Sequence, residues 1–470
     1  MYIPLRFVVP PKTLAERDGA LSANTREYQS KFSYLWLVIG LGSQLQILYS
    51  LSISEIIILC VVPFVFHSEL QFMRKNGIMP FFNITLFLLF GCIVSLIANH
   101  AATYQVIRGL AVTIILVCAV VMAHRMLRTD PNGLKWYFVG AMFSTFLCSF
   151  VFKHASDVAA MNNFGYASIT SGALFWIERL KALFFTPSLA FYLKMPLAYS
   201  FGIPVMHALF SILTSASGRS NALGSLGAAA VVMIGKKNYR SIKAMGRHFL
   251  LVFCLAVLSI YVAKATYQWA ALNNVLGEKA RAKFEYQTAG GTGIVKLLIG
   301  GRVDAFVGLL AIAESPILGK GYWAPDTKGY YETFLAKYGN TMDYEEYMKR
   351  KLSYAEQGRI IRLGKIIACH SHITSFWLWY GLPGLIFWIY VVYVIFRYLR
   401  YDAYAIPQWF FWLAAGVPSF MWDLFFSPFT GRLNFSVWVV GMLLTRAVRQ
   451  GSYQLPASML AEIDKVEKEV

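Results

Sequence analysis

The sequence predicts an all-α polytopic membrane protein with about twelve membrane-spanning helices and one long outer loop. Hydrophobic residues make up 57% of its 470 residues, charged residues make up 14%, and the mean hydropathy is +0.52. The charged residues gather between apolar runs of about 17–25 residues, and each such run can cross a ~30 Å hydrocarbon core as a helix. An ordinary soluble domain has neither this composition nor these runs.

The expected spans follow one another with short connections, except before the tenth. The clearest runs are "ITLFLLFGCIVSLIA" and "GLAVTIILVCAVVMA", whereas Arg179, Lys181 and Lys194 interrupt the region around residues 162–214. Apolar run length therefore predicts spans at residues 33–49, 53–69, 80–98, 104–124, 134–153, 162–178, 195–214, 219–235, 248–267, 373–397, 407–425 and 432–448.

Basic residues decide which ends of the spans face the cytoplasm, because Lys and Arg are enriched in short cytoplasmic loops. They follow the second, fourth, eighth and tenth expected spans, for example at Arg74, Arg128, Arg240 and Arg400. The net charge of +19 is then a topology signal, with anionic lipid or phosphate as further partners and no nucleic acid. The resulting division is a cytoplasmic segment 1–32, about nine helices in 33–267, an outer loop 268–372 with short helices, three helices in 373–448 and a cytoplasmic tail 449–470.

Two histidines, His370 and His372, stand just before the tenth expected span, in "IIACHSHITSFWLWYGLPGLIFW". An imidazole with a near-neutral pKa can accept a proton at working pH, so either histidine is a candidate general base. The alternative is a histidine packed at the start of an interfacial helix. A spacing of two residues puts the rings on different helix faces, and the six cysteines show no metal spacing, so we expect no metal site.

Four arginines map to the outer side, where the positive-inside pattern makes them unexpected. Arg108 lies about one turn inside the fourth expected span, Arg219 and Arg432 open spans, and Arg302 opens a loop helix. An arginine at the bilayer centre costs roughly 2.5–3.5 kcal/mol, less near the interface, so an intramembrane arginine such as Arg108 is a candidate for binding phosphate. The alternatives are that these arginines mark the membrane boundary, or that Arg108 pairs with a carboxylate such as Asp423.

The turn "GKGYW" presents two aromatic side chains, Tyr322 and Trp323, in the outer loop. Such rings can lie against a sugar face or can form part of the small core of the loop. As a nucleotide-binding motif the stretch is weak, because it does not join a strand to a helix.

Three of these pieces occur in one order: "SGRSNALGSLG", then "GRVDAFVGLLAIAESPILGKGYW", then "HSHITSFWLWYGLPGLIFW". In this order they resemble the O-antigen ligase and polysaccharide polymerase superfamily, over about residues 160–390. The first piece departs from the family pattern by a Gly between its Ser and Arg219. The third departs at Ser371, where the family has Asn after its catalytic histidine, so His370 is the counterpart and His372 is held in reserve.

The resemblance implies a GT-C-like, metal-independent glycosyltransferase of the bacterial inner membrane, with its active site facing the periplasm. The donor would be a glycan on undecaprenyl diphosphate, and no cofactor beyond that lipid carrier is implied. Guanidinium groups would stabilise the diphosphate leaving group, and one histidine would take the proton of the acceptor hydroxyl. The expected roles are catalysis by His370 or His372, diphosphate binding by Arg219, Arg302, Arg108 and Arg432, and glycan contact by Tyr322 and Trp323.

Several functions are compatible with this set of residues. A polymerase is favoured over an O-antigen ligase acting on lipid A–core, because the outer loop is long and rich in tyrosine. A secondary transporter or lipid flippase would show internal repeats and polar residues near the midplane. A scaffold in an export complex would leave the ordered arginines and histidine unexplained. Donor and acceptor glycans and membrane lipids are the expected partners, and a chain-length regulator is a further candidate.

Overall fold

The computed structural model of the chain describes an α-helical membrane protein. Among the residues described, four helices are long and apolar enough to cross a membrane: α2 (Ile53–Lys75), α3 (Met79–Ala98), α4 (Thr103–Thr129) and α19, which runs with its π-helical end from Leu382 to Asp402. The description covers residues 34–43, 46–48, 51–150, 303–337, 366–367, 369, 371–403, 405–426, 429 and 431–455, and isolated positions between 227 and 273.

The other described elements are shorter or less apolar. The connections contribute the hairpin strands β1 (Gln46–Leu48) and β2 (Leu51–Ser52) and the 3₁₀ turn η2 (Pro131–Gly133). The helices are α5 (Leu134–Phe150), α14 (Val303–Glu314), α15 (Tyr330–Lys337), α18 (His372–Tyr380), α19 proper (Leu382–Arg397), the π turn η4 (Tyr398–Asp402), α20 (Pro407–Phe426) and α21 (Arg432–Arg449).

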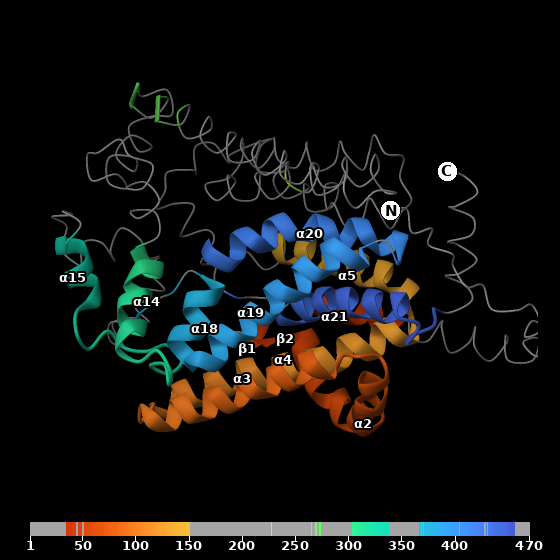
Figure 1. The fold of residues 1–470 in the computed structure, drawn as a ribbon, viewed down its shortest axis with the longest axis horizontal. Helices are drawn as coiled ribbons and strands as arrows, with labels where there is room; N and C mark the ends of the chain where they lie inside the picture. The colour runs from red at the N-terminus through yellow and green to blue at the C-terminus, as the bar shows by residue number, and fades with distance from the viewer. Residues whose placement is uncertain are drawn as a thin grey trace, which may run out of the picture.

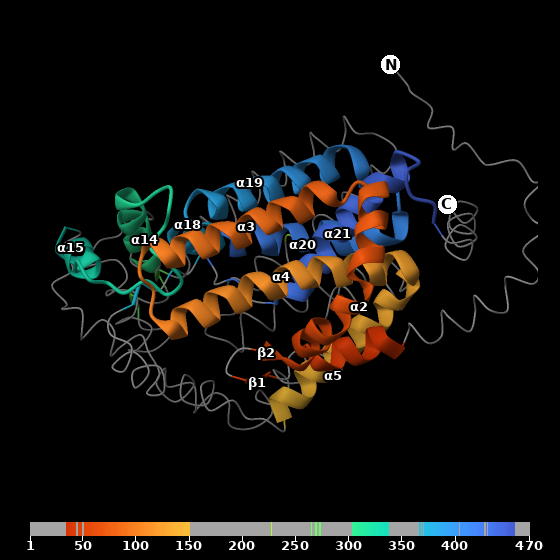
Figure 2. The same cartoon turned by 90° about the horizontal axis from the view of Figure 1, so that it is seen from below.

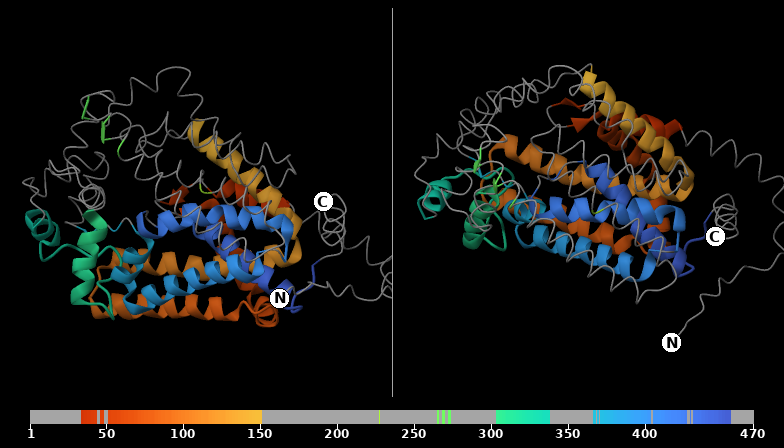
Figure 3. Two further views of the ribbon diagram at one scale, coloured as in Figure 1. Left: turned by 45° about the horizontal axis from the view of Figure 1, so that its top comes forward. Right: turned by 90° about the horizontal axis from the view of Figure 1, so that it is seen from above.

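Helices α3, α4, α19, α20 and α21 run along the long axis of the molecule, and α14 and α15 lie at one end of them (Figures 1 and 2). In the left view of Figure 3, α14 stands across that end. We call it the loop end, where α3 passes into α4. The opposite end, where α4, α19 and α21 finish, is called the basic end after its arginines, among them Arg128 and Arg397.

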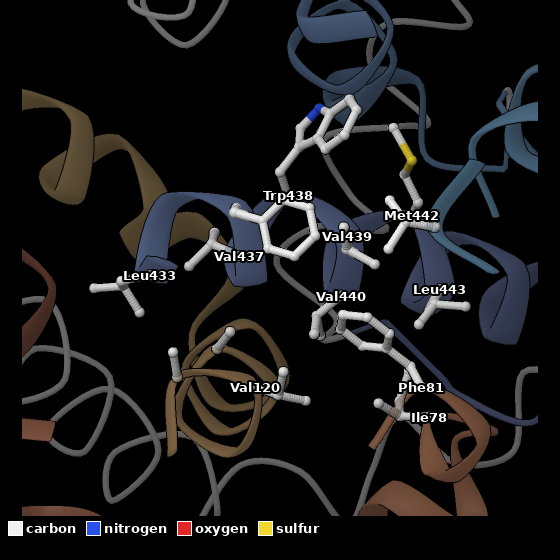
Figure 4. Packing of buried hydrophobic residues seen from close by; sticks show 14 of the residues in the cluster. Ile78, Phe81, Val120, Leu433, Val437, Trp438, Val439, Val440, Met442 and Leu443 are labelled. Atoms are coloured by element: carbon white, nitrogen blue, oxygen red, sulfur yellow. The ribbon is translucent and has the colours of Figure 1, made fainter. Parts of the chain in front are cut away.

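The core forms where α4 packs between α2, α3 and α21. Val120 of α4 is fully buried and faces Val440 of α21, with Phe81 of α3 beside them (Figure 4). Large apolar side chains also cover the outside of the bundle; Phe64, for example, is 90% exposed. In water such a surface would drive association, whereas in a bilayer it is the expected contact with lipid.

The expected first span, 33–49, is not one helix. Residues 34–42 are helical, and the chain then turns into the β1–β2 hairpin. The run contains glycines and polar residues in "GLGSQ", which weaken a helix although the mean hydropathy stays high. Ser52 restarts the helical structure with a capping box: its hydroxyl accepts from the Glu55 amide (3.3 Å) and its amide donates to the Glu55 carboxylate (3.0 Å).

The expected helices at 53–69, 80–98, 104–124, 407–425 and 432–448 are confirmed within a few residues at most of their ends, and the helix expected at 134–153 is described as far as Phe150. The loop helix expected from "GRVDAFVGLLAIAES" is α14. The expected spans within 162–267 lie outside the described residues, apart from isolated positions.

Candidate functional site at the loop end

The expected tenth span, 373–397, consists of two helices joined at Gly381. This residue has φ 68° and ψ −149°, a conformation that is essentially restricted to glycine, and it ends α18 and begins α19. The two helices turn back on each other, since the His372 ring lies 5.2 Å from the Trp388 ring and Phe376 contacts Phe387. His372, the first residue of α18, therefore lies at the opposite end of α18 from the tip of this hairpin.

The turn "SPILGKGYW" packs directly on the tip of the hairpin. The Lys320 amide donates to the Leu378 carbonyl (2.6 Å), and the Leu382 amide donates to the Ile317 carbonyl (2.9 Å). A side chain at Gly381 would collide with the Ile317 carbonyl, so glycine is required for close approach as well as for backbone conformation. Two segments that are distant in sequence thus form one rigid unit.

The last turns of α3 hold this unit against the bundle. The buried hydroxyl of Ser95 donates to the Trp379 carbonyl (2.8 Å) and accepts from the Gly321 amide (3.1 Å). Asn99, one turn later, donates to the Gly319 carbonyl (3.2 Å). Sequence reasoning missed both residues, although a Ser and an Asn four positions apart at the end of an apolar run are a usable signal for a polar contact between segments.

Arg108, Tyr322, Trp323 and Trp379 form a cluster beside the unit, which we call the Arg108 platform. The Arg108 guanidinium lies 4.6 Å from the Trp323 ring centroid, and the rings of Tyr322 and Trp323 are stacked at 5.9 Å. The ring centroid of Tyr322 also lies 4.7 Å from that of Trp379. A cation resting on a ring face keeps the N–H groups at its edge for an anion, so the platform can bind phosphate beside aromatic rings suited to a sugar.

Trp323 is held in an unusual backbone conformation. Its φ of 55° lies in the left-handed region, which costs a bulky residue on the order of 1–3 kcal/mol. The Gln105 side chain of α4 donates to the Trp323 carbonyl (3.0 Å) and so helps to keep the ring under Arg108. Strain of this kind is concentrated at functional sites, which favours a binding role for the platform over a role in the loop's own core.

His372 is buried at the base of the hairpin, with 6% of its surface exposed. Its Nδ1 bonds to the Asp423 carbonyl, which can only accept, so we assign the proton to Nδ1. Trp388 and Phe429 enclose the ring at 5.2 and 5.3 Å. Ser371 caps α18 and donates to the Leu424 carbonyl (3.0 Å), so this corner fastens α18 to α20. The enclosure favours a positioning role for His372 over that of an accessible base.

Cys369, next to the two histidines, is not suited to act as a nucleophile. It is buried between α14 and α18, in the apolar cluster that also contains Val307 and Leu378. Burial raises the pKa of the Cys369 thiol well above its usual value, which keeps the thiol protonated.

Arg432 has a different environment from Arg108. Its Nε lies 3.0 Å from Oε1 of Glu55, and both side chains are buried. The pair joins the beginning of α21 to the capped beginning of α2. Its geometry favours a structural role for Arg432 over the expected diphosphate binding. Arg108, in turn, does not pair with Asp423, and no carboxylate of the described residues lies within ion-pair distance of it.

Three predicted site residues, Arg219, Arg302 and His370, lie outside the described residues. Of the sequence-predicted set, the structure brings together Arg108, Tyr322 and Trp323. Within the described part of the chain, no group of three or more His, Cys, Asp or Glu side chains could hold a metal ion.

No protein-family model, no curated protein and no solved structure matches this chain.

Proposed function

We propose that this chain is a membrane-embedded glycosyltransferase of the polysaccharide polymerase type. It would transfer a glycan from undecaprenyl diphosphate to a lipid-linked acceptor glycan. The observation that carries the proposal is the packing of "SPILGKGYW" on the "GLPG" turn, through the Lys320–Leu378 and Leu382–Ile317 backbone bonds. These are the second and third pieces of the resemblance to the O-antigen ligase and polysaccharide polymerase superfamily, and a shared site gives a physical reason for their occurring together.

The proposed chemistry needs fixed cations and one base. The acceptor hydroxyl oxygen bonds to the anomeric carbon, the bond from that carbon to the diphosphate breaks, and the electron pair leaves with the diphosphate. Arg108 stabilises the growing charge together with Arg219 and Arg302, as fixed cations can do without a metal. His370 takes the hydroxyl proton, while Tyr322 and Trp323 contact the glycan.

In this proposal the loop end faces the periplasm and the basic end faces the cytoplasm of a bacterial inner membrane. Arg125, Arg128 and Arg397 at the basic end support this orientation, because arginine is enriched on the cytoplasmic side. The complete fold would be GT-C-like with about twelve membrane-spanning helices. The platform would then lie at the level of a lipid-linked diphosphate in the outer leaflet.

The proposal is tested with the full-length protein in nanodiscs and a lipid-linked repeat unit, with and without lipid A–core. Growth of the lipid-linked glycan without lipid A–core is the expected result. Transfer only when lipid A–core is present would assign a ligase instead. We expect His370→Ala to lower turnover roughly 10²–10⁴-fold, the usual contribution of a general base.

The matched control is His67→Ala, because His67 is an exposed histidine of α2 outside the proposed site. It should retain wild-type turnover. Turnover that survives His370→Ala would remove His370 as the base, and turnover abolished by EDTA would contradict catalysis by arginines alone. No transfer to either acceptor by a folded protein would refute the proposed activity.

A further inference from the structure

Four arginines gather where α19 and α21 finish at the basic end, and we call them the α19–α21 arginine cluster: Arg397, Arg400, Arg446 and Arg449. Among the described residues, a single carboxylate lies within ion-pair distance of any of them. Asp402 is buried and lies 2.7 Å from Arg449 Nε and 3.8 Å from Arg397 Nε. The cluster therefore keeps a clear excess of positive charge.

The neighbouring arginines on α4 are better compensated, because two arginines rather than four share one carboxylate. Arg125 and Arg128 both pair with Glu69, at 3.0 and 2.6 Å, and His124 bonds the same carboxylate. Arg400 makes no such pair within the described part of the chain; its guanidinium lies 5.1 Å from the Tyr401 ring centroid. Arg449 lies over the same ring at 5.8 Å, and Arg446 bonds to Gln450 (3.2 Å).

The cluster also adjoins a surface suited to acyl chains. Tyr401, which the guanidinium groups of Arg400 and Arg449 both approach, is 48% exposed. Phe396 and Tyr393, on the preceding turns of the same membrane-spanning helix, are also exposed. Aromatic side chains at the membrane–water interface can contact acyl chains, and arginines beyond them can contact phosphate. The order of these residues therefore matches the order of chains and phosphate in a phospholipid.

We propose that the α19–α21 arginine cluster is a binding site for the phosphate headgroup of an anionic phospholipid. Arg400, Arg446 and Arg449 hold the phosphate, and Tyr393 and Phe396 contact the chains. Asp402 orients Arg449 toward Tyr401 rather than cancelling the whole cluster. This site lies at the opposite end from the Arg108 platform and is independent of the proposed glycosyl transfer.

The test uses the full-length protein in phosphatidylcholine–detergent micelles, titrated with cardiolipin while the apparent unfolding temperature is followed. A ligand that binds the folded state raises this temperature with its concentration. Cardiolipin should stabilise the wild-type protein. The apparent affinity should fall about fivefold for each charge removed in R400Q/R446Q, a variant that leaves the Asp402–Arg449 pair intact.

The matched control is R74Q/K75Q, which removes two exposed charges from the last turn of α2 at the same end. It should bind cardiolipin like the wild type. Equal weakening in both double variants would refute a defined site and leave only a general surface charge. Sodium phosphate alone should give no stabilisation; an equal effect of phosphate would refute a lipid ligand and assign a soluble anion. Wild-type affinity in R400Q/R446Q would also overturn the proposal.

Discussion

Helix α4 carries arginines at both of its ends, and the two ends surround them differently. At the basic end, Arg125 and Arg128 share the fully buried carboxylate of Glu69, which also bonds His124. At the loop end, Arg108 rests on the Trp323 ring. Arg128 also lies over a ring, that of Phe72 at 3.8 Å, so the difference between the two ends is the carboxylate. A carboxylate partly compensates the charge and ties the arginine to the fold, whereas an aromatic face alone holds the side chain in place and leaves its charge for an anion.

The environment of an arginine does not simply depend on the end of the molecule at which it lies. Arg432 begins α21 and was expected to bind diphosphate with Arg108, yet it is paired with Glu55 and resembles the Glu69 group in character. The presence of a carboxylate partner, rather than position along the membrane, therefore separates structural arginines from candidate ligand-binding ones.

The largest effect is expected where a buried carboxylate is removed. Glu69→Leu leaves Arg125, Arg128 and His124 around an apolar side chain, and loss of one partner from a buried ionic group costs about 3–5 kcal/mol. We expect a similar loss for Arg432→Gln, because Glu55 stays buried without its cation. Unfolding in detergent, followed by tryptophan fluorescence, measures both.

Ser68→Leu is the matched control for Glu69→Leu, since Ser68 is the exposed neighbour on the same helix. It should change stability by no more than about 0.5 kcal/mol. If Arg432→Gln proved as stable as the wild type but lost activity, Arg432 would be a ligand-binding arginine like Arg108. A carboxylate partner would then not mark an arginine as structural.

The next effect concerns the rigidity on which the loop end depends. Gly381→Ala should destabilise the protein by about 3 kcal/mol, because it combines a backbone conformation restricted to glycine with a collision against Ile317. Gly77→Ala is the control: it has the same sign of φ but open space around it, so about 1 kcal/mol is expected. Equal unfolding temperatures for the two variants would show that the junction at Gly381 is not tightly packed.

The sequence was sufficient for elements that depend on one uninterrupted apolar run. Helices α2, α3 and α4 were predicted because each run is long and is bounded by turn or charged residues. The break at Gly381 was not predicted, since hydropathy stays high through "SFWLWYGLPGLIFW" and does not report a reversal of the chain. The glycine and proline of "GLPG" were the available signal.

The candidate site was predicted as residues but not as contacts. Arg108, Tyr322 and Trp323 were each selected for their chemistry, yet a guanidinium stacked on Trp323 needs two segments from distant parts of the sequence. The same holds for Glu55 and Arg432, near opposite ends of the chain. One sequence shows which side chains could interact and carries no signal for which of them meet.

A smaller effect, on function rather than stability, is expected at the platform. Arg108→Gln should lower turnover of a lipid-linked glycan roughly 10- to 100-fold, since it removes one charged contact worth roughly 1.5–3 kcal/mol. Its unfolding temperature should stay close to that of the wild type, because no described carboxylate is left unpaired. Arg74→Gln, which removes an exposed arginine from the basic end, should change neither quantity.

The smallest effect is a pH dependence in the turn that carries the platform. Lys328, Tyr330 and Lys320 donate hydrogen bonds to Glu314, at 2.8, 2.5 and 2.9 Å, and these bonds lower the pKa of Glu314 from its ordinary 4.5 to about 2. A carboxyl group whose pKa is lowered by folding stabilises the folded state above its unfolded pKa. That contribution is therefore present at neutral pH and is lost as the pH falls from about 4.5 toward 2.

Comparison of the wild type with Glu314→Gln isolates this contribution from other titrating groups. The wild type should unfold at a slightly higher temperature at pH 7, and the difference should shrink as the pH approaches 3. Because the group is exposed, added salt should also reduce the difference at pH 7. A difference that is independent of pH would show that Glu314 acts through its shape or its neutral hydrogen bonds. In that case the charge of Glu314 would contribute nothing to stability, in contrast to the charge that we expect to matter at Glu69.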